Sequence, residues 1–118
     1  MIRIDNRYGT IEVSQEYFRH LVGEAVSSCY GVVGMVSKSP VKGLRALLGR
    51  NTGKVEDGVR VRSEGDRLVV DVHIEVVFGM NISAIAKSIV NKVRYSVEEA
   101  TGLTVKKVNV FVDGIQPE

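Results

Sequence analysis

The chain has 118 residues, and its 44% hydrophobic and 25% charged content excludes a largely disordered protein and predicts one domain over residues 1–118. The single cysteine, Cys29, excludes a disulfide framework, and the lack of a signal-peptide pattern or of ~20 consecutive apolar residues predicts a cytoplasmic protein without direct membrane insertion. A formal net charge of +2 excludes a basic field over the whole molecule.

The first predicted elements are a short strand and an amphipathic helix. Residues 8–13 alternate apolar and polar side chains, as a strand does. Ser14 suits a helix N-cap, and apolar residues then recur at helical spacing, which predicts a helix over residues 15–29. The polar side of this helix carries His20, which we expect at the surface. The apolar side carries Cys29, which we expect to be a buried, inert thiol.

The segment that follows is irregular and basic. Ser39-Pro40 suits a helix start, and the apolar residues Val41, Leu44, Leu47 and Leu48 predict a short helix that ends at Gly49. Between Lys38 and Arg62 there are two acidic residues, Glu56 and Asp57, and seven basic ones: Lys38, Lys42, Arg45, Arg50, Lys54, Arg60 and Arg62. A local excess of basic residues predicts an acidic partner surface.

The second half predicts a hairpin, a long helix and a last strand. Val59 and Val61 begin one strand, and residues 68–78 form the next, with the even-numbered side chains through Phe78 facing the core. A helix should run from the N-cap Asn81 to Gly102, followed by a strand over residues 105–112. The order is β-α-(short α)-β-β-α-β. It predicts an α+β, two-layer sandwich with a small mixed sheet and both long helices on one face.

The sequence offers no catalytic constellation, so we expect no enzyme, no cofactor and no metal. Asp71, His73 and Glu75 share one face of a predicted strand, but alternate residues lie roughly 6–7 Å apart, which is wide for three ligands of one metal. Residues 31–34 read Gly-Val-Val-Gly, the G-x-x-G spacing of an RNA clamp, but without basic residues between the glycines.

Two surfaces are predicted to make contacts. The predicted partner-binding residues are Lys42, Arg45, Arg50, Lys54, Arg60 and Arg62. The outer face of the sheet carries apolar side chains among polar ones, which predicts a homo-oligomer. The predicted self-association residues are Val69, Val77 and Phe111.

Four stretches carry a family resemblance: YGTIEVS (8–14), CYGVVGM (29–35), VVFGMNISAIAKSIVNKV (76–93) and ATGLTVKKVNVFVDGI (100–115). Together they resemble the alkaline shock protein, or envelope stress response, family of Gram-positive bacteria, and in particular its short members. The resemblance implies a cytoplasmic, non-enzymatic protein linked to envelope homeostasis. Some members are held at the membrane by a small anchoring protein, and some are associated with control of fatty-acid synthesis.

The leading hypothesis is therefore a protein-interaction module in cell-envelope homeostasis or stress response. A small membrane-anchoring or envelope protein would recruit it to the inner face of the cell membrane. One alternative is a nucleic-acid-binding module that uses residues 38–62, and another is a regulator linked to fatty-acid synthesis. A further alternative is an enzyme or metal protein that uses Asp71, His73 and Glu75.

Overall fold

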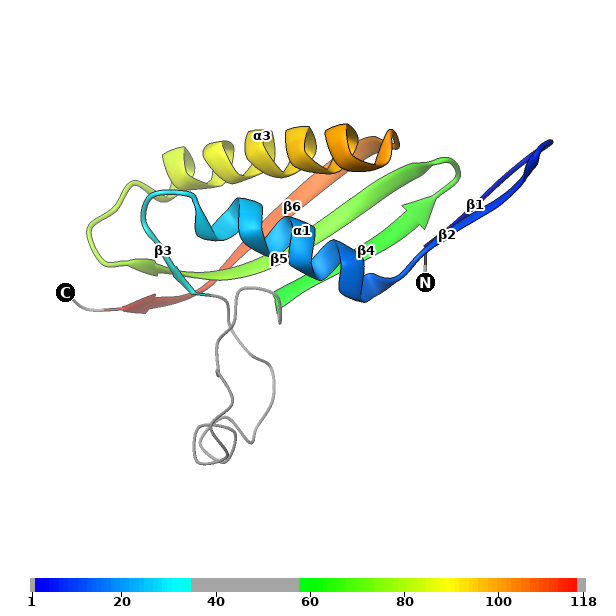
Figure 1. Cartoon of the computed structure of the whole chain (residues 1–118). Coiled ribbons are helices and arrows are strands. Elements are labelled where there is room, and N and C mark those ends of the chain that lie inside the picture. Colours follow the sequence, from blue (N-terminus) through cyan, green and yellow to red (C-terminus); the bar gives the residue numbers. More distant parts are fainter. Residues whose placement is uncertain (1, 35–57, 117–118) are drawn as a thin grey trace, which may run out of the picture.

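The structure, a computed structural model, describes residues 2–34 and 58–116. Two helices lie side by side over one face of a mixed four-stranded sheet, and a separate hairpin projects beside it (Figure 1). The predicted two-layer α+β architecture is therefore confirmed. In chain order, the elements are β1 (Ile2–Asn6), β2 (Gly9–Val13), α1 (Gln15–Ser27), β3 (Val32–Gly34), β4 (Val59–Glu64), β5 (Arg67–Val77), α3 (Ile82–Thr101) and β6 (Thr104–Gln116).

Strand β5 is the centre of the sheet. Strand β6 pairs with it in parallel from Arg67 to Val77, as expected for two strands joined through a helix. Strand β4 pairs antiparallel with the first part of β5, and β3 pairs antiparallel with Glu75 and Val76 near its end. Because β6 occupies one edge of β5 along its whole length, β4 and β3 share the other edge and lie in line.

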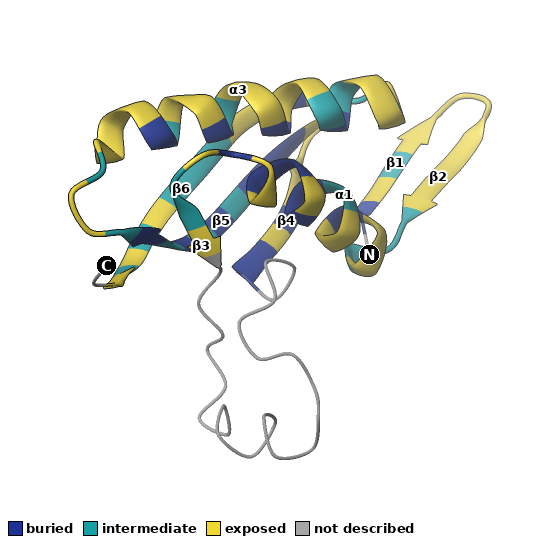
Figure 2. Ribbon diagram, turned by 60° about the vertical axis from the view of Figure 1, so that its left-hand side comes forward, coloured by how far each residue is buried: buried dark blue, intermediate teal, exposed yellow. Residues whose placement is uncertain are grey.

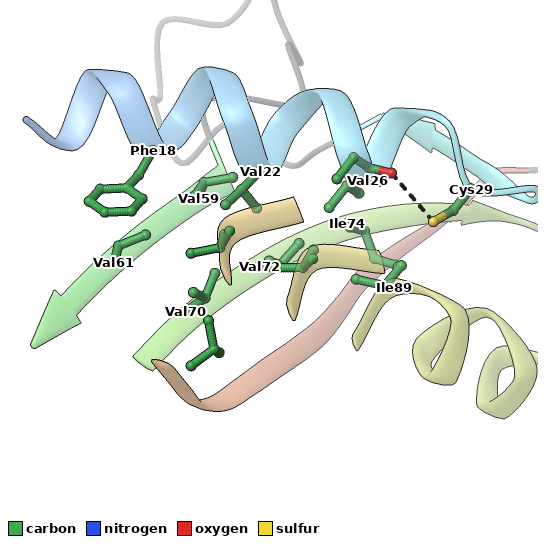
Figure 3. Packing of buried hydrophobic residues seen from close by; sticks show 14 of the residues in the cluster. Phe18, Val22, Val26, Cys29, Val59, Val61, Val70, Val72, Ile74 and Ile89 are labelled. Carbon is green, nitrogen blue, oxygen red and sulfur yellow. Dashed lines mark hydrogen bonds between the residues drawn. The ribbon is translucent and has the colours of Figure 1, made fainter. Parts of the chain in front are cut away.

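The core lies between this sheet and the two helices. Even-numbered β5 residues from Leu68 to Val76 are buried, which confirms the predicted alternation along this strand. Figure 2 shows buried stretches along β5 and along the sides of both helices that face the sheet. Figure 3 shows Val70, Val72 and Ile74 of β5 packed between the sheet and the helices. Each fully buried aliphatic side chain contributes about 1.5–3 kcal/mol, so this layer dominates the stability. The helical side chains of the layer are Phe18, Val22 and Val26 on α1, and Ile85, Ile89, Val93 and Val97 on α3.

The predicted N-caps of both helices and the predicted end of α3 at Gly102 are confirmed, whereas α1 ends at Ser27 instead of residue 29. The Ser14 hydroxyl accepts a hydrogen bond of 3.1 Å from the Tyr17 N–H and caps α1. The Asn81 side-chain oxygen accepts one of 3.0 Å from the Ala84 N–H and caps α3. At the other end of α3, Gly102 has φ 72° and its N–H donates to the Glu98 carbonyl.

Strands β1 and β2 form an amphipathic hairpin of their own. On its polar face the Thr10 hydroxyl and the Arg3 guanidinium donate to Asp5, and these bonds lower the pKa of that carboxyl. Its apolar face pairs Ile2 with Val13 and Ile4 with Ile11. Ile2 is buried against the core, whereas Ile11, nearer the tip, is 48% exposed.

Three other details of the sequence-based fold were wrong. Strands β1 and β3 were not predicted, because β1 is short and charged and β3 has only three residues. Strand β6 continues to Gln116 instead of ending at residue 112. Phe78 was predicted to face the core but is 67% exposed, because β5 ends at Val77, where the chain turns through Gly79. The short helix predicted after Pro40 lies outside the described residues.

Candidate binding surface on the open sheet face

No described helix lies over the second face of the sheet (Figure 1). We call this surface the open face. Alternate residues of β4, β5 and β6 form it, because successive side chains of a strand point to opposite sides. It therefore gathers charged and aromatic side chains that lie far apart in the sequence. Its residues are Arg60, Arg62, Val69, Asp71, His73, Glu75, Val77, Lys107, Asn109, Phe111 and Asp113.

A hydrogen-bonded network crosses the open face at Asp71. The Arg62 guanidinium donates to one carboxylate oxygen at 2.7 Å, and the Asn109 amide donates to the other at 2.8 Å. These three side chains come from β4, β5 and β6, so the network ties all three strands together. Because both oxygens of Asp71 already accept from a protein donor, this carboxylate is a structural anchor, and it is poorly placed to act as a general base.

His73 is held in a fixed orientation beside this network. Its Nδ1 lies 2.6 Å from an Asp113 carboxylate oxygen, so Nδ1 carries the proton and donates. Its ring stacks on Phe111 with centroids 4.6 Å apart and planes 14° apart. Asp113 is the extra residue of a β-bulge in β6, a distortion that commonly aims side chains at functional sites. Within residues 2–34 and 58–116, Nε2 of His73 has no hydrogen-bond partner.

The three residues considered as metal ligands do share the open face, but each has a different partner. Asp71 binds Arg62 and Asn109, His73 binds Asp113, and Glu75 accepts a 3.3 Å bond from the Gln116 amide. Within residues 2–34 and 58–116, no group of three or more His, Cys, Asp or Glu side chains is arranged to hold a metal ion.

A hollow of about 200 Å³ opens at the β4 side of the open face. Arg60, Asp71, His73 and Phe111 line it from the sheet, and Arg19 reaches it from α1. Gly58 and Val59 complete the lining. In the described part of the chain, the guanidinium groups of Arg19 and Arg60 form no ion pair or hydrogen bond. Among the described residues, the hollow therefore presents two guanidinium groups without a bonded partner next to an ordered imidazole.

A second, larger and shallower groove of about 440 Å³ runs between α1 and α3 on the opposite side of the molecule. Its walls mix apolar residues with charged ones of both signs. They include Leu21, Glu24, Ala25, Lys92, Tyr95 and Glu99.

The predicted contact residues have different outcomes. Lys42, Arg45, Arg50 and Lys54 lie outside the described residues. Arg60 and Arg62 lie on the open face, where the Arg62 guanidinium donates a hydrogen bond to the Asp71 carboxylate.

Of the predicted self-association residues, Val69 is on the open face but only 1% exposed, so it offers almost no surface for a contact. Val77 is half-buried, and Phe111 is 43% exposed. The predicted surface position of His20 and the predicted burial of Cys29 are confirmed.

Sequence reasoning missed Arg19 and Asp113 as site residues. Arg19 lies on the polar side of its helix, where nothing distinguishes it from other solvated charges. Asp113 follows Phe111 at strand spacing, a signal that was available but lay beyond the predicted end of the strand. Residues 32–34 of the Gly-Val-Val-Gly segment form β3, which pairs with β5, and the Cα of Gly31 faces Ile85, so the segment is part of the sheet instead of a clamp loop.

Comparison with known proteins gives matches over nearly the whole chain. A model of the alkaline shock protein 23 family, described as having a cell envelope-related function, matches residues 3–117. The uncharacterized protein YloU of Bacillus subtilis (strain 168) is 38% identical over 116 residues, which cover 98% of this chain and 95% of that protein. The uncharacterized protein Spy1614 of Streptococcus pyogenes serotype M6 is 34% identical over 116 residues, which cover 98% of this chain and 94% of that protein.

A likeness to solved structures concerns the fold alone. A MamM-CTD variant superposes with a TM-score of 0.50 at 17% identity, covering 86% of this chain and 98% of that chain. Within the described residues, no helix is long and apolar enough to cross a membrane.

Proposed function

Because this chain belongs to the alkaline shock protein 23 family, whose function is described as cell envelope-related, we propose that it is a non-enzymatic protein-interaction module of the cell envelope. The open face is the observation that supports this proposal. It presents charged and aromatic side chains over three strands, and cross-strand hydrogen bonds at Asp71 and His73 hold several of them in place. Such a preorganised polar surface loses little conformational entropy when a partner binds.

In this proposal, a membrane-anchored or envelope protein provides the attachment to the membrane. The protein itself works in the cytoplasm, at the inner face of the membrane when the partner is bound. Isolated basic residues near an anionic bilayer contribute about 1 kcal/mol each, so a few of them would not hold the protein there without a partner.

The charge distribution argues against nucleic acid as the main ligand. A nucleic-acid-binding surface follows the phosphate backbone with a continuous row of basic residues. On the open face the basic residues Arg60, Arg62 and Lys107 alternate with the acidic residues Asp71 and Glu75. No feature of the described residues favours a direct role in fatty-acid synthesis over other envelope functions.

The proposal is tested by affinity capture from the membrane fraction of the native cells. The wild-type chain should retain a specific envelope protein, and the variant R60E/K107E should retain at least tenfold less, because both changes reverse charge on the open face. The matched control K87E/R94E places the same two changes on α3 and should bind like wild type. Circular dichroism verifies that all variants are folded.

Three results would count against this proposal. Wild type and R60E/K107E could retain the same proteins equally, or the wild-type chain could retain no envelope protein at all. Recovery of ribonuclease-sensitive RNA would favour the nucleic-acid alternative. A further variant, K42E/R45E/R50E, tests the basic segment. If this variant alone loses the envelope partner, the partner binds the basic segment and not the open face.

A further inference from the structure

The hollow lined by Arg19, Arg60 and His73 has the chemistry of a receptor for one acidic side chain. We propose that it binds a carboxylate of the envelope partner, an Asp or Glu side chain, and we call it the carboxylate pocket. This inference rests on the proposed function, because it names the chemical group by which the partner is recognised. The carboxylate pocket consists of Arg19, Gly58, Val59, Arg60, Asp71, His73 and Phe111.

The charges of the lining favour a single negative charge. Arg19 and Arg60 contribute two positive charges and Asp71 one negative charge, which leaves the lining at +1. The Asp71 carboxylate is already occupied by the Arg62 guanidinium and the Asn109 amide. Neither guanidinium of the pocket bonds to it in the described part of the chain. An incoming carboxylate would supply the acceptor that Arg19 and Arg60 lack among the described residues.

The donor types match a carboxylate in geometry as well as in charge. A guanidinium presents parallel N–H groups at the spacing of the two carboxylate oxygens and binds them in a bidentate manner. These bonds are shorter and stronger than neutral hydrogen bonds. Arg19 of α1 and Arg60 of β4 both line the pocket.

His73 and Phe111 make one wall of the pocket rigid. The Asp113 bond and the stacking contact fix the imidazole, so its orientation need not be selected when a ligand enters. The half-exposed Phe111 ring provides an apolar surface for the methylene groups that carry an acidic head. A Glu or Asp side chain has this combination of an apolar stem and a charged end.

The size of the pocket restricts the ligand. Sites for drug-sized molecules and cofactors usually measure about 300–1,000 Å³, whereas this hollow measures about 200 Å³. It is too small for a nucleotide but large enough for one side chain. The lining charge of +1 also matches a carboxylate better than a phosphate, which carries close to two negative charges at neutral pH.

The test uses the full chain and a minimal probe, N-acetylglutamic acid α-amide, in a ¹H–¹⁵N NMR titration. We expect saturable shifts that are confined to signals of Arg19, Gly58, Arg60, His73 and Phe111. The variants R19Q and R60Q should each weaken binding at least tenfold, and R60K should recover only part of the loss because lysine cannot bind in a bidentate manner. R94Q removes an exposed arginine from α3 and should bind like wild type.

Two further probes and one variant distinguish the alternatives. The neutral glutamine analogue should cause no saturable shift, and inorganic phosphate should bind more weakly than the glutamate probe. Shifts of equal size with the glutamine analogue, tighter binding of phosphate, or unchanged affinity in R19Q and R60Q would each overturn the proposal. Tenfold tighter binding of the glutamate probe by the variant E56Q/D57N would also overturn the proposal. It would show that a carboxylate of Glu56 or Asp57 in the chain itself competes for the pocket.

Failure of this inference is separable from failure of the proposed function. If R19Q/R60Q retains the envelope partner as wild type does, while R60E/K107E does not, the open face remains the docking surface and the carboxylate pocket is not its recognition site. If the wild-type chain retains no partner, the proposed function itself is wrong, whatever the titration shows.

Discussion

At the scale of single residues, Gly31 has the most restricted position. It has φ 92°, which L-amino acids with a side chain rarely adopt. A Cβ added there would lie 2.8 Å from Cδ1 and 3.3 Å from Cγ1 of Ile85, which is buried in the core. Rotation about the Cβ–Cγ1 bond of Ile85 would move Cδ1 but not Cγ1, so the buried Ile85 side chain would still have to shift by a few tenths of an ångström.

We therefore expect Gly31→Ala to destabilise the protein by more than its backbone conformation alone explains. Gly79 is the matched control, because it also has φ 92° but an added Cβ would meet no atom within 4 Å. Each alanine costs about 1–2 kcal/mol for the positive φ, and Gly31→Ala should cost a further ~1–3 kcal/mol for overpacking. Urea denaturation of both variants measures the difference in their free energies of unfolding. Equal midpoints would show that the Ile85 side chain moves aside without loss of stability.

At the scale of elements, the two outer edges of the sheet differ in whether a side chain binds their backbone groups. The Gln15 side chain at the start of α1 accepts a 3.2 Å bond from the Val61 N–H and donates to the Val61 carbonyl. The Gln15 side chain thus binds both backbone groups of Val61 on the outer edge of β4. These are the N–H and C=O that another strand would need for pairing at this position. No described strand pairs with the outer edge of β6. Exposed edges of this kind readily pair with other chains.

Replacing Gln15 should therefore weaken the attachment of α1 to the sheet. Gln15→Ala removes both bonds to Val61, and we expect a loss of about 1–3 kcal/mol in the free energy of unfolding. Lys87→Ala, on the exposed side of α3, should change it by no more than about 0.5 kcal/mol. Chemical denaturation followed by circular dichroism compares the two, and a cost for Gln15→Ala no larger than that of the control would contradict the role assigned to this residue.

The sequence predicts the long elements better than the short ones, for physical reasons. The periodicity of α1, α3 and β5 extends over many residues and reports directly which face is buried. Strand β3 is too short to show a period, and it exists because β5 offers it an edge. In the candidate site, the polar face of β5 could be predicted by alternation. The contacts of Arg19 and of Asp113 could not, because they depend on how α1 and a bulge in β6 approach residues about 40 or more positions away.

At the scale of the whole molecule, self-association is a further proposal. Phe111 keeps 43% of its surface exposed on the open face, next to an outer strand edge without a described partner. Val77 lies on the same face and is half-buried, whereas Val69 contributes no exposed surface. A second copy that covered Phe111 and paired along β6 would remove both apolar surface and free backbone groups from water.

We expect a homodimer or higher oligomer at micromolar concentration. At ~100 μM, even a dimer with a Kd of ~10 μM, equivalent to about −7 kcal/mol, would be mostly formed. Phe111→Ser should shift the protein toward monomer, whereas Tyr95→Ser, which removes an exposed aromatic ring from α3, should not. Sedimentation velocity measures both, and a monomeric wild-type protein at ~100 μM would remove the proposal.

The shared edge of β5 has a consequence for how the protein can be engineered. Gly34 at the end of β3 pairs with Glu75, and Val59 at the start of β4 pairs with Val72, so the two strand ends lie three residues apart along one strand, roughly 10 Å. A few residues would be enough to bridge this span. The pairing of β3 and β4 with β5 therefore requires only a short connection between Gly34 and Val59. Since the two strand ends lie this close, a reporter domain whose own termini are adjacent could be grafted between them without separating β3 and β4 from β5.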